Sequence, residues 1–201
     1  MPKLIVIAGC NGAGKSVFAS SFLPNHLVSF DYDKLFLAHY NSMPDSEWRE
    51  EIAKNQTSKD FEAAVENALI KKKDFCYETN FDTYPVYWPK IFKEKGYQIN
   101  LIFFCLTRQA IARHRIQVRT EFKGHFVDDK TIDLKWKAGY KNVNLHFEYF
   151  DNVLFVDNSK QNVVYNNILQ IEGCKIELMA DSVPNYFKHR LPAVQKLIIS
   201  I

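Results

Sequence analysis

Residues 3–16 read Lys3-Leu4-Ile5-Val6-Ile7-Ala8-Gly9-Cys10-Asn11-Gly12-Ala13-Gly14-Lys15-Ser16, and this stretch decides the fold. The apolar run 3–8 predicts a strand, and residues 9–16 fit the complete phosphate-binding pattern G-x-x-x-x-G-K-[ST]. Glycines in such a loop allow a tight turn whose N–H groups face a polyphosphate, and the helix that follows adds a partial positive charge. In this pattern Lys15 reaches the β- and γ-phosphates, and the hydroxyl of Ser16 holds Mg²⁺. The predicted nucleotide-binding residues of this loop are Gly9, Asn11, Gly12, Ala13, Gly14, Lys15, Ser16 and Val17.

Length and composition favour a single folded domain. The 201 residues are 47% hydrophobic and 14% aromatic, which is typical of a globular protein. A net charge of +3 is too small to indicate a nucleic-acid or membrane-surface protein. We expect a core over about residues 1–170 and a C-terminal strand–helix extension over about 171–201.

The cysteines and the start of the chain bear on the compartment. The four cysteines lack C-x-x-C spacing, which favours free thiols in a reducing compartment over a disulfide framework. The chain opens directly on a strand, so we expect no signal peptide, and its apolar runs are too short to span a bilayer. These features predict a cytoplasmic protein without a membrane partner.

Strand and helix patterns alternate along the chain. We predict strands at residues 3–8, 27–30, 74–78, 99–106 and 152–156, with helices at 45–55, 59–72, 85–95, 109–121 and 128–149, the last broken at Gly139. A helix at 161–170, a strand at 175–180 and a helix at 184–199 follow. The alternation predicts an α/β fold of the P-loop kinase type, with a five-stranded parallel sheet, helices on both faces and a helical lid after the fourth strand. Ligands of such sheets bind outside the carboxyl ends of the strands.

Carboxylates follow two of the predicted strands. Asp31 and Asp33 lie two residues apart in a segment expected to be extended, so both would face the γ-phosphate region. Asp33 is the candidate base that accepts the proton of an acceptor hydroxyl, and Asp31 would act through Mg²⁺ or waters. The competing interpretation is an Asx-turn pair at a strand end. Glu78 precedes Thr79-Asn80 at the end of the third strand and would bind a hydroxyl or a metal-bound water, unless it is only a solvated strand end.

A basic helix follows the fourth strand and carries Arg113, Arg115 and Arg119. Arg115 and Arg119 are four residues apart, so they share a helix face. Guanidinium groups offset the charge of a phosphoryl group in transfer, which makes Arg119 a candidate catalytic residue. A solvated basic face or a nucleic-acid patch would use the same residues.

The motifs of other nucleotide-binding classes are missing from the sequence. It lacks the D-x-x-G and N-K-x-D elements of guanine switches. It also lacks the acidic pair that a motor ATPase carries at the end of an apolar strand, where this chain has only Tyr77-Glu78-Thr79. We therefore expect a kinase that transfers the γ-phosphoryl group of ATP, with Mg²⁺, to a hydroxyl of a small molecule. A polynucleotide or RNA-end kinase, whose oligonucleotide binding would fall steeply with salt, stays open. So does a non-catalytic nucleotide-binding module, although such a module does not need the pair Asp31 and Asp33.

Taken together, these features resemble the zeta toxin family of P-loop kinases, in its small stand-alone bacterial form. The resemblance runs from Leu4 to about Ser159. Its landmarks are the phosphate loop, Asp31-Tyr32-Asp33, a helix bearing Glu62, Tyr77-Glu78-Thr79, and the stretch from Arg115 through Gly124-His125. Asp157-Asn158-Ser159 resembles the family's loop near the adenine.

The resemblance implies phosphorylation of a small hydroxylated acceptor, which in the well-known toxins is UDP-N-acetylglucosamine, and an antitoxin as a partner. It assigns phosphate binding to Lys15, the base to Asp33 and stabilisation of the phosphoryl group to Arg119. Arg115 and Asn158 would contact the nucleotide, while Asp31, Glu62, Glu78 and Asn80 would face the acceptor. The chain departs from the family in two places. Lys123-Gly124-His125 stands where small homologues have Gly-Gly-His, and the second lid arginine of the larger toxins has no counterpart unless Lys123 or Lys135 replaces it.

Overall fold

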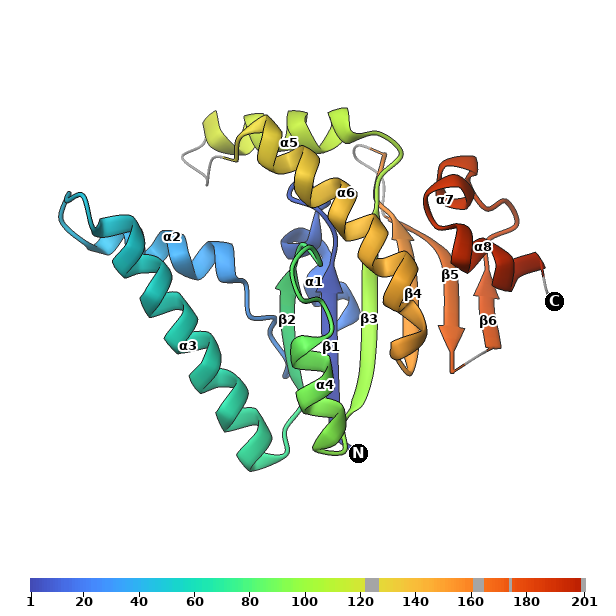
Figure 1. The fold of residues 1–201 in the computed structure, drawn as a ribbon, viewed down its shortest axis with the longest axis horizontal. Coiled ribbons are helices and arrows are strands. Elements are labelled where there is room, and N and C mark those ends of the chain that lie inside the picture. Colours follow the sequence, from blue (N-terminus) through green and yellow to red (C-terminus); the bar gives the residue numbers. More distant parts are fainter. Residues whose placement is uncertain (122–126, 161–164, 174, 200–201) are drawn as a thin grey trace.

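The central strands are apolar on both faces because helices cover the sheet on both sides (Figure 1). The computed structural model describes residues 1–121, 127–160, 165–173 and 175–199. The described strands form one sheet in the order β2-β1-β3-β4-β5-β6. Their bounds are β1 Lys3–Ala8, β2 Phe75–Thr79, β3 Gln98–Cys105, β4 Asn152–Asp157, β5 Asn166–Glu172 and β6 Lys175–Met179. The first four strands in this order are parallel, and β5 and β6 are antiparallel to their neighbours.

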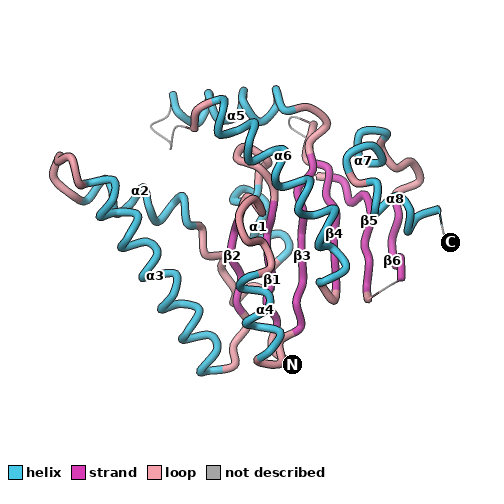
Figure 2. Tube along the Cα trace, in the orientation of Figure 1, coloured by secondary structure: helices cyan, strands magenta, loops and turns pink. Residues whose placement is uncertain are grey.

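Helices connect and cover these strands (Figure 2). Their bounds are α1 Lys15–Phe22, α2 Tyr32–Ser42, α3 Arg49–Lys71, α4 Tyr87–Glu94, α5 Gln109–Glu121, α6 Asp129–His146, α7 Asn185–Arg190 and α8 Pro192–Ile199. α2 and α3 pack on each other and form an arm beside β2, while α5 lies across the carboxyl ends of the central strands (Figure 1). Residues far apart in the sequence thus meet at one end of the sheet.

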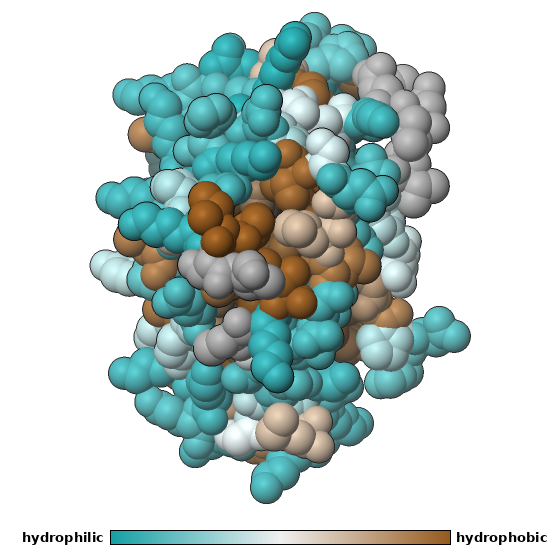
Figure 3. Space-filling model, turned by 90° about the vertical axis from the view of Figure 1, so that its right-hand side faces the viewer, coloured by the Kyte–Doolittle hydropathy of each residue, from teal (hydrophilic) through white to brown (hydrophobic). Residues whose placement is uncertain are grey.

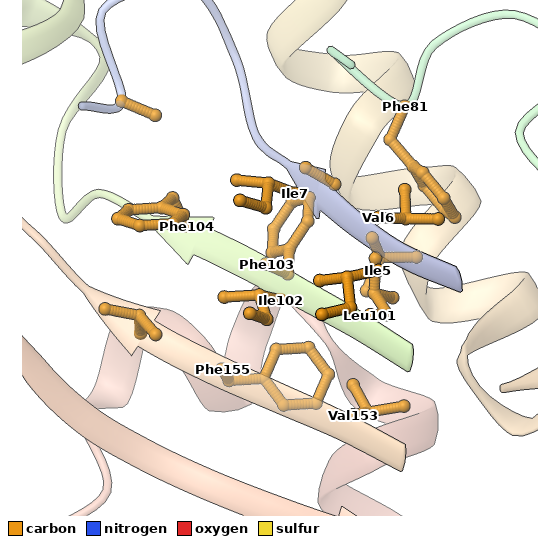
Figure 4. Close-up of a cluster of buried hydrophobic side chains, with 14 of the residues drawn as sticks. Ile5, Val6, Ile7, Phe81, Leu101, Ile102, Phe103, Phe104, Val153 and Phe155 are labelled. Carbon is orange, nitrogen blue, oxygen red and sulfur yellow. The ribbon is translucent and has the colours of Figure 1, made fainter. Parts of the chain in front are cut away.

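Neighbouring phenylalanines of β3 show the two faces of the core directly. The ring of Phe103 meets Tyr140 of α6 with centroids 5.3 Å apart, and the ring of Phe104 meets Phe22 of α1 at 5.7 Å. Successive side chains of a strand point to opposite faces, so α6 and α1 cover opposite sides of the sheet. Figure 4 shows side chains of β1, β3 and β4 packed together in this core, among them Phe155 of β4. On the C-terminal side, formed by β6, α7 and α8, Figure 3 shows apolar side chains gathered at the surface.

The α/β architecture is confirmed, but several details of the prediction were wrong. Residues 27–30 do not form a strand; only Phe30 makes a bridge, to Tyr77, before the chain enters α2. The predicted helices at 45–55 and 59–72 are parts of the single helix α3. The sheet has six strands and is mixed, because residues 166–172 form the antiparallel strand β5, although a helix was predicted over 161–170.

The single helix predicted at 184–199 is two helices in the structure, α7 and α8. Pro192 begins α8, where the missing N–H of proline costs nothing, and its ring prevents α7 from continuing. Residues 161–164 of the predicted helix, Lys123-Gly124-His125 and Cys174 lie outside the described residues. The three described cysteines, Cys10, Cys76 and Cys105, are buried free thiols.

Gly139 does not break α6, which runs without interruption through this position. A Cβ atom at Gly139 would lie 2.8 Å from the backbone carbonyl oxygen of Asn80. The glycine therefore permits close packing of α6 on the segment that follows β2. Asn142, almost one turn later, donates from Nδ2 to the carbonyl oxygens of Phe81 at 2.9 Å and Asp82 at 2.8 Å, which fixes the same contact.

We predict that Gly139→Ala lowers the melting temperature. In an exposed helix this change is stabilising by about 1 kcal/mol, but here the new methyl group meets a backbone atom, and such overpacking costs roughly 1–3 kcal/mol. Thermal unfolding followed by circular dichroism measures the sign, with exposed Lys141→Ala in the same helix as a near-neutral control. A rise in melting temperature in Gly139→Ala would contradict the close packing.

Candidate functional site

The loop after β1 lies in close contact with α5 and with the segment that follows β4. A Cβ at Gly12 (φ 77°) would lie 2.6 Å from the carbonyl oxygen of Ala112 in α5. A Cβ at Gly14 (φ 93°) would lie 2.1 Å from Nδ2 of Asn158, just after β4. Glycine is therefore favoured at both positions for two reasons: the backbone is left-handed, and a neighbouring segment approaches too closely for a side chain. The loop leads directly into α1, whose N-cap is Gly14.

Lys15 is turned back onto this loop. Its Nζ donates to the carbonyl oxygens of Gly9 at 2.7 Å and Cys10 at 3.3 Å, and to Oδ1 of Asn80 at 3.4 Å. Burial lowers the pKa of the Lys15 ammonium, and the negative charge of Asp33 opposes this shift. The position therefore favours a polyanion, which would meet the buried positive charge.

Ser16 and Glu78 bring oxygen atoms together beside Lys15. The hydroxyl of Ser16 donates to Oε2 of Glu78 at 2.7 Å, and Ser29 donates to Oε1 of the same carboxylate at 2.9 Å. Burial raises the pKa of Glu78, the charge of Asp31 adds to the shift, and the two serine hydrogen bonds oppose it. A hydroxyl next to a carboxylate is the kind of oxygen set that Mg²⁺ prefers when phosphate oxygens complete its coordination.

Asp31 and Asp33 are not in an extended segment, so the predicted geometry was wrong. Asp31 is the N-cap of α2 and accepts from the backbone N–H of Lys34 at 3.0 Å. Asp33 lies in the first turn of the helix. Its Oδ2 accepts a hydrogen bond from Nδ2 of Asn11 at 3.3 Å. The helix begins here because Asp31 satisfies one of the free N–H groups of its first turn.

The arginines of α5 take separate positions. Nη2 of Arg115 donates to the carbonyl oxygen of Asn158 at 2.8 Å, and Nη1 donates to that of Gly12 at 3.3 Å. Arg113 forms ion pairs with Asp133 and, at 3.6 Å, with Asp129, which joins α5 to α6. Arg119, near the end of α5, is exposed.

A cavity of about 1210 Å³ opens above the loop, between α5, α6 and the arm of α2 and α3. Of the residues predicted to face an acceptor, all four line it: Asp31, Glu62, Glu78 and Asn80. Of the predicted nucleotide and catalytic residues, Asn11, Gly12, Gly14, Lys15, Ser16, Val17, Asp33, Arg115 and Arg119 line it as well. Gly9, Ala13 and Asn158 do not; Asn158 is buried, and its Nδ2 donates to the carbonyl oxygen of Ala13 at 2.8 Å.

Several residues at the site belong to no sequence motif. Ser29 donates to Glu78, and Lys34 and Trp88 line the cavity from two different helices. Arg190 of α7 donates to the carbonyl oxygens of Leu106 at 2.6 Å and Thr107 at 2.8 Å, where the chain leaves β3 toward α5. Single polar residues without a spacing pattern give no signal in one sequence, and only their place in the fold reveals them.

A glycine-rich loop between a central parallel strand and a helix, with a lysine and a serine directed at one cavity, defines a fold of the P-loop kinase type. The zeta toxin family model matches residues 1–170, and the chain belongs to this family. No curated protein sequence gives a significant match.

Solved structures show the same fold. The toxin–antitoxin system PezAT of the human pathogen Streptococcus pneumoniae has a chain with a TM-score of 0.61 and 16% identity, over 100% of this chain and 87% of that one. A structure of AvrRxo1-ORF1:-ORF2 with ATP has a TM-score of 0.65 and 12% identity, over 94% of this chain and 62% of the other. The Pnkp1/Rnl/Hen1 RNA repair complex contains a chain with a TM-score of 0.54 and 23% identity, over 75% of this chain and 46% of that chain. At these identities the likeness shows a common fold.

Within the described residues, no helix is long and apolar enough to cross a membrane.

The raised pKa of Glu78 predicts a pH-dependent cost to stability. The folded protein holds the proton of Glu78 at higher pH than the unfolded chain, so stability falls as pH rises above the ordinary value of 4.5, and the full cost is present above the raised pKa. We expect Glu78→Gln to melt at a higher temperature than the wild type at pH 7 without ligand, and the difference to close as pH falls below about 4.5. Melting curves across pH measure this, with exposed Glu177→Gln as the control. An equal gap at all pH values would contradict the assignment.

Proposed function

We propose that this protein is an ATP-dependent kinase that transfers the γ-phosphoryl group to a hydroxyl of a small molecule. One observation carries the proposal: a single cavity is lined by the phosphate-loop residues Lys15 and Ser16 and by the carboxylate of Asp33. A protein that only binds nucleotide needs the loop, but it does not need a carboxylate facing the same space.

The phosphate end of ATP would lie against the loop. Lys15 would exchange its carbonyl partners for the β- and γ-phosphates, and the N–H groups at the start of α1 would face the same oxygens. Ser16 and Glu78 would hold Mg²⁺, directly or through water. When bound, the ion would neutralise charge on the phosphates. Arg115 and Asn158 would support the nucleotide from the side of α5 and β4.

Asp33 would accept the proton of the acceptor hydroxyl. The hydroxyl oxygen then bonds to the γ-phosphorus, the bond from that phosphorus to the β–γ bridging oxygen breaks, and ADP leaves. Lys15 and Arg119 would offset the charge that spreads over the moving phosphoryl group. Asp31, Glu62, Glu78 and Asn80 line the same cavity, and the acceptor would lie against them.

Membership of the zeta toxin family supports UDP-N-acetylglucosamine as the first acceptor to test. A partner antitoxin is supported by the same family and by the toxin–antitoxin system among the similar structures. We also propose that the chain works as one domain, since β5 and β6 extend the same sheet as the phosphate-loop strand. A cytoplasmic location fits the buried free thiols.

Asp33→Asn tests the kinase assignment. The amide keeps the shape of the carboxylate but cannot take the proton, so kcat should fall by roughly a hundredfold or more while ATP affinity stays near the wild-type value. Phosphoryl transfer to a panel of nucleotide sugars, including UDP-N-acetylglucosamine, measures the first quantity, and calorimetric titration with Mg·ATP measures the second. Asp181→Asn, an exposed change of the same kind outside the cavity, is the control. Normal transfer by Asp33→Asn would remove Asp33 as the base.

An RNA-end kinase is the second candidate. Lys34, Lys54 and Lys135 line the cavity, and a chain of an RNA repair complex shares the fold over 75% of this protein. A strand end would place its backbone phosphates against such lysines, and its binding would weaken steeply with salt.

Arg119→Ala separates the two candidates. In the small-molecule kinase, its loss should lower kcat by up to about a thousandfold with ATP binding largely kept, and Arg119→Lys should rescue only part because the planar fork is gone. In an RNA kinase, its loss should weaken oligonucleotide binding for all sequences and reduce the salt slope by about one unit. Steady-state kinetics and oligonucleotide titrations at several salt concentrations distinguish the two candidates. The control is Arg108→Ala, which removes the same charge outside the cavity. Intact turnover with lost oligonucleotide binding would favour the RNA kinase.

A further inference from the structure

Asn11 connects the phosphate loop to the helix that carries Asp33. Its side chain is 3% exposed, and its Nδ2 donates to Oδ2 of Asp33 at 3.3 Å. The other polar atom of the amide, Oδ1, is buried and has no hydrogen-bond partner among the described residues. A buried amide with only one of its two ends satisfied is uncommon and calls for a physical reason.

The orientation of this amide follows from Asp33. If the amide were turned over, its carbonyl oxygen would face the carboxylate oxygen, and two acceptors would oppose each other. The N–H groups must therefore point to Asp33, and the unpaired Oδ1 is the consequence. The unpaired carbonyl destabilises the folded protein, and the hydrogen bond to the Asp33 carboxylate offsets this cost.

The helix that carries Asp33 packs on α3, and the chain just before this helix is paired with β2 through Phe30. The hydroxyl of Tyr32 donates to the carbonyl oxygen of Lys54 in α3 at 3.1 Å. Nε2 of His39 lies 2.7 Å from Oδ2 of Asp60, also in α3. α2 and α3 thus form one packed unit beside the sheet (Figure 1). The hydrogen bond from Asn11 joins this unit to the phosphate loop at the residue that would act as the base.

We propose that Asn11 is a positioning residue that holds the carboxylate of Asp33 in register with the phosphate loop. This inference rests on the kinase function proposed above. With Oδ2 of Asp33 held by the amide, the other carboxylate oxygen is left to face the acceptor hydroxyl. Asn11 lies four residues before Lys15 in the same loop, so one short segment sets both the phosphate group and the base. Sub-ångström alignment of these groups is what phosphoryl transfer requires.

A purely structural role for Asn11 makes different predictions. If the amide only shaped the loop, its removal would weaken ATP binding and lower the melting temperature together with the rate. If it positions Asp33, its removal deletes an unsatisfied carbonyl as well as one hydrogen bond, so stability should hold while the rate falls.

Asn11→Ala is the first test. We expect kcat to fall roughly tenfold to a hundredfold, with the calorimetric affinity for Mg·ATP within about twofold of wild type and the melting temperature not lowered. Asn152→Ala is the matched control, because Nδ2 of Asn152 also donates one side-chain hydrogen bond, to Oδ1 of Asn100 at 2.7 Å, between β4 and β3. That variant should lose stability and keep kcat. Unchanged kcat in Asn11→Ala, or a parallel fall of rate, affinity and melting temperature, would overturn the proposal.

A double-mutant cycle with Asp33→Asn separates this inference from the proposed function. If Asn11 acts through Asp33, adding Asn11→Ala to Asp33→Asn should cause no further loss in single-turnover rate. Multiplying losses would mean that Asn11 acts independently of the base. Normal transfer by Asp33→Asn alone would instead overturn the proposed role of Asp33, and the positioning role with it. If the rate of Asp33→Asn falls below detection, the split between kcat and ATP affinity in Asn11→Ala decides alone.

Discussion

The close contact of the phosphate loop with its surroundings is the constraint on which the rest of the structure depends. Gly12 touches the backbone of α5, and Gly14 touches Asn158 beyond β4, at distances that leave no room for a Cβ. For these contacts β1 lies inside the sheet, between β2 and β3, with β4 next in order. α5 returns across the carboxyl ends of the strands, and this places Arg115 against the loop. The geometry of the site therefore depends on the order of the strands.

The charges of the site are arranged for a ligand rather than for stability. The ammonium of Lys15 lies among backbone carbonyls, and the half-buried carboxylate of Glu78 lies beside two serines. Loss of solvent contact shifts the pKa of each group toward its neutral form. A polyphosphate with its cation would relieve both shifts at once. The buried, half-satisfied amide of Asn11 belongs to the same pattern, since functional sites tolerate local costs that cores do not.

The C-terminal segment belongs to the same construction, although the family model ends at residue 170. The guanidinium of Arg190 lies 4.8 Å from the ring centroid of Trp136 and 5.2 Å from that of Tyr140, both in α6. It also donates to the two carbonyl oxygens where β3 ends. One side chain of α7 thus fixes the position of α6 relative to the start of α5. The ion pairs of Arg113, near the start of α5, join this helix to the first turns of α6 as well.

The sequence by itself determined the phosphate loop, its flanking strand and helix, and the α/β class, because these follow from residue types at fixed local spacing. It also indicated that Glu78 and Asn80 lie at the end of a strand, and the structure places both on the cavity. It could not determine that residues 27–30 make a single bridge or that residues 166–172 form an antiparallel strand. Short apolar segments fit strand and helix alike until their neighbours are known. Only the tertiary structure decided that Asn11 reaches Asp33 and that Gly139 lies against Asn80. Each of these depends on a contact between residues distant in the chain, and such a contact leaves no period or spacing in one sequence.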